Sequence, residues 1–147
     1  MHRLALALLA VLLAGSAPPP KTALLTRVRA ESGRVVFSFR TAPGRVTARY
    51  VPTSQLAEDP SGKPVRVAGS AALVVRFTPA SGVDQSGGTF TLVYRGPKRL
   101  QPAARGPVQE VVRTGDFEAV LSWAIGLDTR RPFHVARAGA NVVVTVG

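Results

Sequence analysis

The sequence predicts an all-β fold, a small β-sandwich of short antiparallel strands. Three observations predict it. Apolar and polar residues alternate with a period of two in several short runs, as they do in half-buried strands. Dipeptides rich in Gly, Pro and Ser, which form turns, separate these runs. Hydrophobic residues make up 46% of the 147 residues, so the one domain that such a chain can form is able to bury a core.

Residues 1–17 have the features of a secretory signal peptide. His2-Arg3 gives a positively charged start, an unbroken apolar run covers Leu4–Leu13, and small residues follow up to Ala17. A transmembrane anchor is the alternative, but a spanning helix needs about 20 apolar residues. Ser16 stands where a lipoprotein would carry its lipidated cysteine. We therefore expect a secreted, extracytoplasmic protein of the cell envelope with no lipid anchor and no stable membrane span after cleavage.

The mature chain is expected to start with a Pro-rich tether over residues 18–23, because three consecutive prolines favour an extended segment. The domain itself is expected over residues 24–147. Its first three strands should form a meander, since the turn dipeptides Ser32-Gly33 and Pro43-Gly44 separate them. The alternating runs that indicate strands lie at residues 24–29, 34–40, 45–50, 73–78, 90–95 and 142–146.

One apolar segment, Phe117–Leu127, fits two kinds of secondary structure. Every second residue from Leu121 to Leu127 is apolar, as in a strand, but apolar residues also recur at helical spacing. Gly126 would suit the end of a helix. We favour a strand for this segment, and we expect Trp123, the only tryptophan, to lie in the core.

Catalytic chemistry finds little support among the residues present. The chain has no cysteine, which excludes disulfides, thiolate metal sites and cysteine nucleophiles. His134 would need a serine and a carboxylate beside it, and the candidates, Ser122 and Asp116, lie in no nucleophile motif. The mature chain has one histidine, which cannot build the usual zinc site, and its carboxylates lack calcium-loop spacing. We expect a non-catalytic protein with no metal and no cofactor, in which His134 lies on a strand and faces water.

Basic residues dominate the charge of the chain. The sequence has 19 Lys and Arg against 8 Asp and Glu, which gives a formal net charge of +11. Such an excess favours anionic partners such as wall polymers, lipid headgroups or nucleic acid. Export argues against nucleic acid, so no nucleic-acid partner is expected. The alternative explanation is a solvated surface that only keeps the protein soluble.

Six arginines of the first three runs share the parity that points away from the core. If Val35, Phe37 and Phe39 point inward, the arginines point outward, and all six would lie together on one exposed sheet face. Like charges side by side repel each other, and a bound polyanion would relieve this repulsion through bidentate guanidinium contacts. The predicted ligand-binding residues are Arg27, Arg29, Arg34, Arg40, Arg45 and Arg49.

Several segments resemble the AMIN-like domain of secreted actinobacterial proteins. The most specific is Gly115–Leu127, with the sequence GDFEAVLSWAIGL, and PFHV follows it at Pro132–Val135. The resemblance covers residues 24–147. Its other segments lie at residues 34–39, 94–100 and 142–146.

This resemblance implies a β-sandwich related to the AMIN domain of cell-wall amidases, a non-catalytic module that targets envelope proteins in part by binding peptidoglycan. The leading hypothesis is a secreted, non-catalytic envelope module that binds peptidoglycan or an anionic cell-wall polymer. One alternative is an envelope protein–protein adaptor, in which Val36, Val74 and Val93 form an exposed apolar patch. A weaker alternative is a small wall hydrolase that uses His134 or Asp116.

Overall fold

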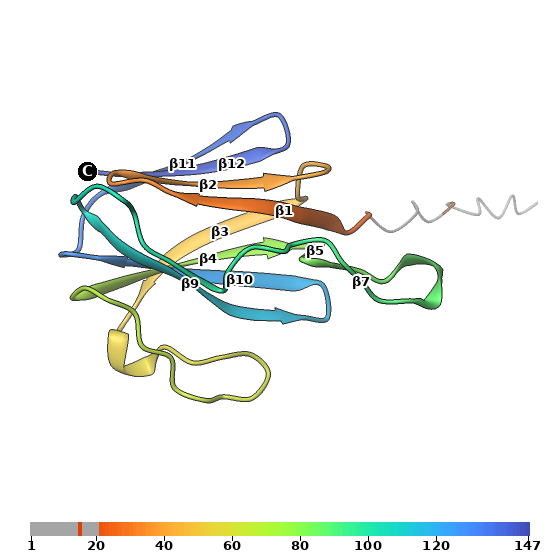
Figure 1. Ribbon diagram of the computed structural model, residues 1–147, viewed down its shortest axis with the longest axis horizontal. Coiled ribbons are helices and arrows are strands. Elements are labelled where there is room, and N and C mark those ends of the chain that lie inside the picture. Colours follow the sequence, from red (N-terminus) through yellow and green to blue (C-terminus); the bar gives the residue numbers. More distant parts are fainter. Residues whose placement is uncertain (1–14, 16–20) are drawn as a thin grey trace, which may run out of the picture.

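Two β-sheets packed against each other form an all-β sandwich, which confirms the predicted fold class (Figure 1). The computed structural model describes residue 15 and residues 21–147. The predicted signal peptide, apart from residue 15, and the prolines of the tether lie outside the described residues. The first sheet has the strand order β11-β12-β2-β1-β5 and the second β3-β4-β10-β9-β8. Neighbouring strands are antiparallel, except that β5 runs parallel to β1.

The strands of each sheet come from both halves of the chain. The first sheet consists of β1 (Ala23–Ala30), β2 (Arg34–Phe39), β5 (Ala80–Ser81), β11 (Phe133–Ala138) and β12 (Asn141–Val146). The second consists of β3 (Arg45–Val51), β4 (Ala71–Thr78), β8 (Arg99–Leu100), β9 (Val108–Phe117) and β10 (Val120–Leu127). A separate hairpin pairs β6 (Val83–Asp84) with β7 (Thr91–Leu92), and the short 3-10 helices are η1 (Thr53–Gln55) and η2 (Ser86–Gly88).

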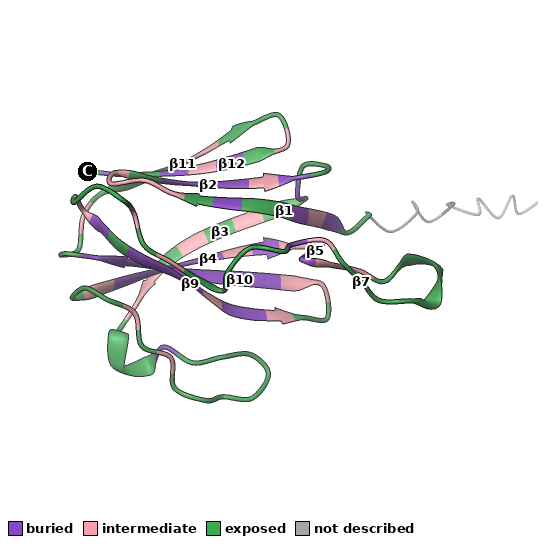
Figure 2. Cartoon of the chain, in the orientation of Figure 1, coloured by how far each residue is buried: buried purple, intermediate pink, exposed green. Residues whose placement is uncertain are grey.

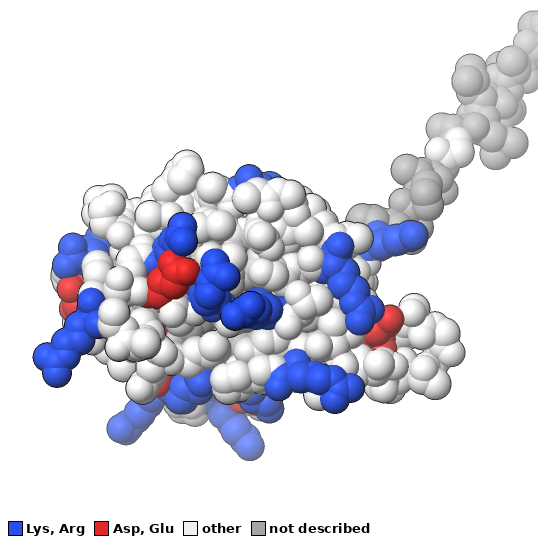
Figure 3. Space-filling model, turned by 45° about the horizontal axis from the view of Figure 1, so that its top comes forward, with Lys and Arg blue, Asp and Glu red and all other residues white. Residues whose placement is uncertain are grey.

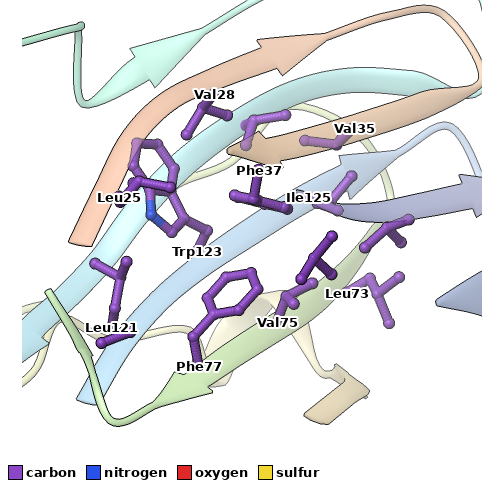
Figure 4. Packing of buried hydrophobic residues seen from close by; sticks show 14 of the residues in the cluster. Leu25, Val28, Val35, Phe37, Leu73, Val75, Phe77, Leu121, Trp123 and Ile125 are labelled. Atoms are coloured by element: carbon purple, nitrogen blue, oxygen red, sulfur yellow. The ribbon is translucent and has the colours of Figure 1, made fainter. Parts of the chain in front are cut away.

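Large apolar side chains fill the space between the two sheets (Figure 4), and Figure 2 shows buried residues along the strands of both sheets. Phe37 of the first sheet and Phe77 of the second lie with their ring centroids 4.9 Å apart. Trp123 is fully buried, as predicted, and the ring of Tyr94 meets it edge-on at 5.5 Å. Alternating residues of strands in both sheets supply this core, which is why the period-two pattern is so plain in the sequence.

A smaller core lies on the outer face of the second sheet. Residues 52–70, which link β3 to β4, cross this face, and Leu56 packs there on Val74. Gly126 permits the close approach, because a Cβ at this position would lie 2.0 Å from the carbonyl oxygen of Ala68. The crossing segment therefore buries the second sheet on both of its faces.

One prediction about the strands is wrong and another holds only in part. The first three strands do not form a meander: β1 and β2 pair, but β3 pairs with β4 in the second sheet. The run at residues 90–95 is a strand only at Thr91–Leu92, where Leu92 is 51% exposed. Phe90 is 78% exposed, and Tyr94 alone of the run lies in the main core. Alternation shows which side of a strand is apolar, but it does not show which sheet receives the strand.

The segment Phe117–Leu127 forms a strand, as favoured, and not a helix. Its first residues make the tight turn between β9 and β10, in which Glu118 and Ala119 have positive φ angles of 49° and 60°. β10 then runs between β4 and β9 at the centre of the second sheet. In the described part of the chain, no helix has the length and apolar character that crossing a membrane requires.

Candidate anion-binding surfaces

Four of the six predicted binding arginines lie on the outer face of the first sheet. Arg27 and Arg29 flank the buried Val28 in β1, and both are exposed. Arg34 begins β2, and the exposed Arg40 follows its last residue. The register places Arg27 opposite Ser38 and Arg29 opposite Val36 on the neighbouring strand. Figure 3, in which the top of Figure 1 comes forward, shows blue basic groups outnumbering red acidic ones on this side.

One carboxylate neutralises part of this arginine surface. Glu31, in the turn between β1 and β2, accepts a hydrogen bond from Arg29 Nε at 2.9 Å and another from Arg34 Nε. The hydrogen bond from Arg34 lowers the pKa of the Glu31 carboxyl most, so the group stays ionised at neutral pH. Arg27 and Arg40 have no ion-pair partner among the described residues. Their guanidinium groups are therefore available to an anion, although, besides the hydrogen bonds from Ser86, the charge of Arg40 also helps to lower the pKa of the Asp84 carboxyl in β6.

The remaining two predicted arginines do not share this face. Arg45 and Arg49 lie on β3, whose pairing with β4 places them on the second sheet. Both are exposed. The prediction that all six arginines share one face is therefore wrong, because the chain crosses from one sheet to the other between Arg40 and Arg45.

The apolar patch expected for an adaptor is also absent. Val36 is only 6% exposed and Val74 only 5% exposed, although both point away from the main core. Val74 lies beneath the crossing segment 52–70. Val93 is half-buried. These three residues therefore form no exposed surface on which a partner protein could dock.

A shallow cleft of about 380 Å³, which the sequence did not reveal, lies beside the β6–β7 hairpin. Val83 and Leu92 of the hairpin form one wall. The segment after β7 and the end of β9 form the rest, with Tyr94, Arg95, Gly96, Lys98, Arg113 and Asp116. Three cations and one carboxylate thus face the same space.

The floor of this cleft is held by hydrogen bonds around Gly82. Its N–H donates to Asp116 Oδ2 at 2.8 Å, and its carbonyl oxygen accepts from the N–H groups of Val93 and Tyr94, both at 2.9 Å. The hydroxyl of Tyr94 donates to the carbonyl oxygen of Pro97 at 2.7 Å. Burial raises the pKa of Tyr94, and the nearby charge of Arg113 lowers it in part.

The residues nominated for hydrolysis do not come together. Ser122 is buried and accepts a hydrogen bond from Thr114 at 2.9 Å. Asp116 binds the backbone of Gly82, and His134 is exposed on β11 of the other sheet, as its strand pattern predicted. The described residues contain no group of three or more His, Cys, Asp or Glu side chains that could hold a metal ion.

Comparison with known protein families identifies the domain. The family model described as the AMIN-like domain matches residues 23–147, from the first residue of β1 onward. The chain belongs to the AMIN-like domain family. Membership indicates a cell-wall-associated module, and AMIN-like domains are extracytoplasmic and generally non-catalytic. No curated protein and no solved structure gives a significant match.

The family match also gives a structural meaning to the most specific segment of the sequence. Gly115 and Gly126 both lie where residues 52–70 cross the second sheet. A Cβ at Gly115 would lie 3.0 Å from both Asp59 Cβ and Ser122 Oγ. The AMIN-like segment 115–127 therefore supplies the core strand and the two glycines on which the crossing segment rests.

Proposed function

We propose that this AMIN-like protein is an exported, non-catalytic cell-wall module that binds peptidoglycan or another anionic wall polymer. The observation that carries the proposal is the outer face of the first sheet, where Arg27, Arg29, Arg34 and Arg40 are exposed and the carboxylate of Glu31 pairs only with Arg29 and Arg34. Guanidinium groups pair with carboxylate and phosphate alike, so the surface suits a polymer that carries either group. Residues 1–17 serve as the export signal in this proposal.

The electrostatic arrangement supports a surface that holds an extended polymer. Arg27 and Arg40 are free, whereas Arg29 and Arg34 share Glu31, so the face carries a clear excess of positive charge. Exposed contacts of this kind are individually weak, roughly 0.2–1 kcal/mol each. Several of them along one polymer add to a useful affinity that falls steeply with ionic strength.

Sedimentation of the protein with purified cell walls across a salt series tests this proposal. We expect the double variant Arg27→Glu, Arg40→Glu to bind about tenfold more weakly than the wild type at low salt. The matched control is Arg45→Glu, Arg49→Glu, which reverses the same number of charges on β3 of the second sheet. This control should keep most of the binding.

Two results would contradict the proposal. Binding that does not change with salt concentration would exclude ion pairing as its source. Equal loss of binding in the two double variants would show that affinity follows the net charge of the protein and not the face of β1 and β2.

A further inference from the structure

The cleft beside the β6–β7 hairpin has cations that lack protein partners. Arg95 and Lys98 are exposed at its rim, and Arg113 is half-buried opposite Trp123 in the register of β9 and β10. Among the described residues, none of these three cations forms an ion pair. Because Arg113 is only partly exposed and the cleft lies beside the buried ring of Tyr94, an anion that enters the cleft meets less water than one on the open surface.

The positions of these cations are fixed by the packing around them. The N–H of Arg113 donates to the carbonyl oxygen of Lys98 at 2.8 Å, which joins the two residues through their backbones. Gly96 lies under the ring of Tyr94, and a Cβ there would lie only 2.6 Å from the tyrosine hydroxyl. The turn that carries Arg95 and Lys98 thus packs against a buried aromatic ring. Its backbone is already ordered, so a ligand that binds there causes only a small loss of conformational entropy.

Asp116 distinguishes this cleft from a simple anion site. Its Oδ2 accepts from Gly82, while Oδ1 has no hydrogen-bond partner among the described residues and can accept from a ligand. A carboxylate at this place repels a polyphosphate chain, but it suits a ligand in which an N–H or ammonium group lies close to an anion. The apolar wall of Val83 and Leu92 suits a small aliphatic side chain on the same ligand.

We propose that this cleft binds a short wall peptide by its free carboxylate, with Arg113 and Lys98 pairing with the carboxylate and Asp116 accepting a hydrogen bond from the peptide. This inference rests on the proposed function, since it names the part of the wall that the module holds. The outer face of the first sheet then supplies general attraction to the wall, and the cleft supplies selectivity for the peptide.

Calorimetric titration with soluble glycopeptides, released from purified walls by a muramidase, tests the inference. Arg113→Gln and the exposed Lys98→Gln should each bind the glycopeptides about tenfold more weakly than the wild type. The matched control is Arg130→Gln, which removes a cation from a second cleft, of about 370 Å³, and should bind as the wild type does. Glycopeptides whose carboxyl groups have been converted to methylamides should also bind the wild type about tenfold more weakly.

A second probe, inorganic tripolyphosphate, separates a peptide site from a phosphate site. We expect the wild type to bind it more weakly than the glycopeptides, and Asp116→Asn to bind tripolyphosphate more tightly but the glycopeptides more weakly. The inference is overturned if tripolyphosphate binds the wild type better than the glycopeptides do. It is equally overturned if both cleft variants, or the methylamidated peptides, show unchanged affinity.

The sedimentation assay with intact walls keeps the two proposals apart. Salt-dependent wall binding without glycopeptide binding would overturn the cleft inference and leave the proposed function standing. No wall binding by the wild type at low salt would overturn both.

Discussion

At the scale of single residues, Glu31 decides how many guanidinium groups the arginine surface can offer. Its two oxygens are bound by Arg29 and Arg34, while Arg27 and Arg40 stay free. Arg34, the stronger of the two partners, holds the pKa of the Glu31 carboxyl below its usual value, so the carboxylate is ionised at neutral pH. An incoming polymer must therefore compete with Glu31 for half of the surface.

Replacing this carboxylate should strengthen binding. Glu31→Gln keeps the size of the side chain but removes its charge, and it releases both arginines for the ligand. We expect wall affinity to rise about twofold to fivefold at low salt, with a steeper dependence on salt, since each exposed ion pair is a small contribution. Sedimentation with purified walls measures the change.

Glu118→Gln is the matched control for this prediction. Glu118 is exposed in the turn between β9 and β10, away from the arginine surface, and its substitution removes the same charge. If both variants bind equally well, the gain comes from net charge alone. If Glu31→Gln binds more weakly than the wild type, Glu31 holds the arginines in the geometry that binding requires.

At the scale of elements, the crossing segment 52–70 makes β10 an interior strand on both faces. Every residue of β10 from Leu121 to Leu127 is buried. The main core covers one face, and the crossing segment covers the other at Gly126, where the backbone of Ala68 leaves no room for a side chain. A strand in the centre of a sheet tolerates glycine poorly unless another backbone must approach it closely.

Gly126→Ala should therefore destabilise the whole domain. The added methyl group would lie 2.0 Å from the Ala68 carbonyl oxygen and 2.7 Å from Val67 Cγ2, so the crossing segment must move away. We expect a loss of about 3 kcal/mol in the free energy of unfolding, measured by urea denaturation. Gly33→Ala is the control, since no atom lies within 4 Å of a Cβ there. Equal stability of the two variants would contradict this packing.

The sequence predicted strands at the positions of β1, β2, β3, β4, β10 and β12. Burial alternates along β3 and β12, whereas β4 and β10 are buried on both faces and have largely apolar sequences. β9 escaped prediction because Glu110, Val111 and Val112 are buried in succession, which removes the alternation. Its buried carboxylate is held by Arg99 Nη1 at 2.5 Å and by the N–H of Ala68 at 3.1 Å, and neither contact is visible in the sequence.

The sequence predicted the candidate sites only in part, as it did the strands. Side-chain parity placed Arg27, Arg29 and Arg34 on an exposed face correctly, although in β1 this parity holds only after the bulge between Leu25 and Arg27. It failed for Arg45 and Arg49, because the choice between a hairpin and a crossing to the other sheet depends on tertiary packing. The cleft joins three separate segments, so its cations and Asp116 show no common spacing in the sequence.

At the scale of the whole molecule, a side chain of the first sheet and one of the segment between β7 and β8 close the sandwich along its sides. On one side, Arg137 of β11 donates to the carbonyl oxygens of Pro43 and Gly44, at 2.5 and 3.0 Å, where the chain enters β3. On the side of the cleft, Tyr94 inserts its ring against Trp123. The stability of a Tyr94 variant therefore measures how much this contact contributes to the packing of the two sheets.

Titration of Tyr94 at alkaline pH should weaken this closure. Its pKa is raised by burial, so the protonated phenol contributes stability that is fully present below the unfolded pKa of about 10 and is lost as the pH rises through the raised pKa. Tyr94→Phe cannot ionise, and it lacks the hydrogen bond to Pro97, so it should be about 1 kcal/mol less stable than the wild type at neutral pH. Above pH 10 or so the difference should shrink.

Urea denaturation of both proteins from pH 7 to 11 measures this difference. The two proteins differ only at residue 94, so the comparison isolates the contribution of Tyr94. A difference that stays constant over the whole range would mean that Tyr94 has the same pKa in the folded and unfolded chains. The ring would then be open to water, and the cleft would lack the buried floor that holds Arg95 and Lys98 in place.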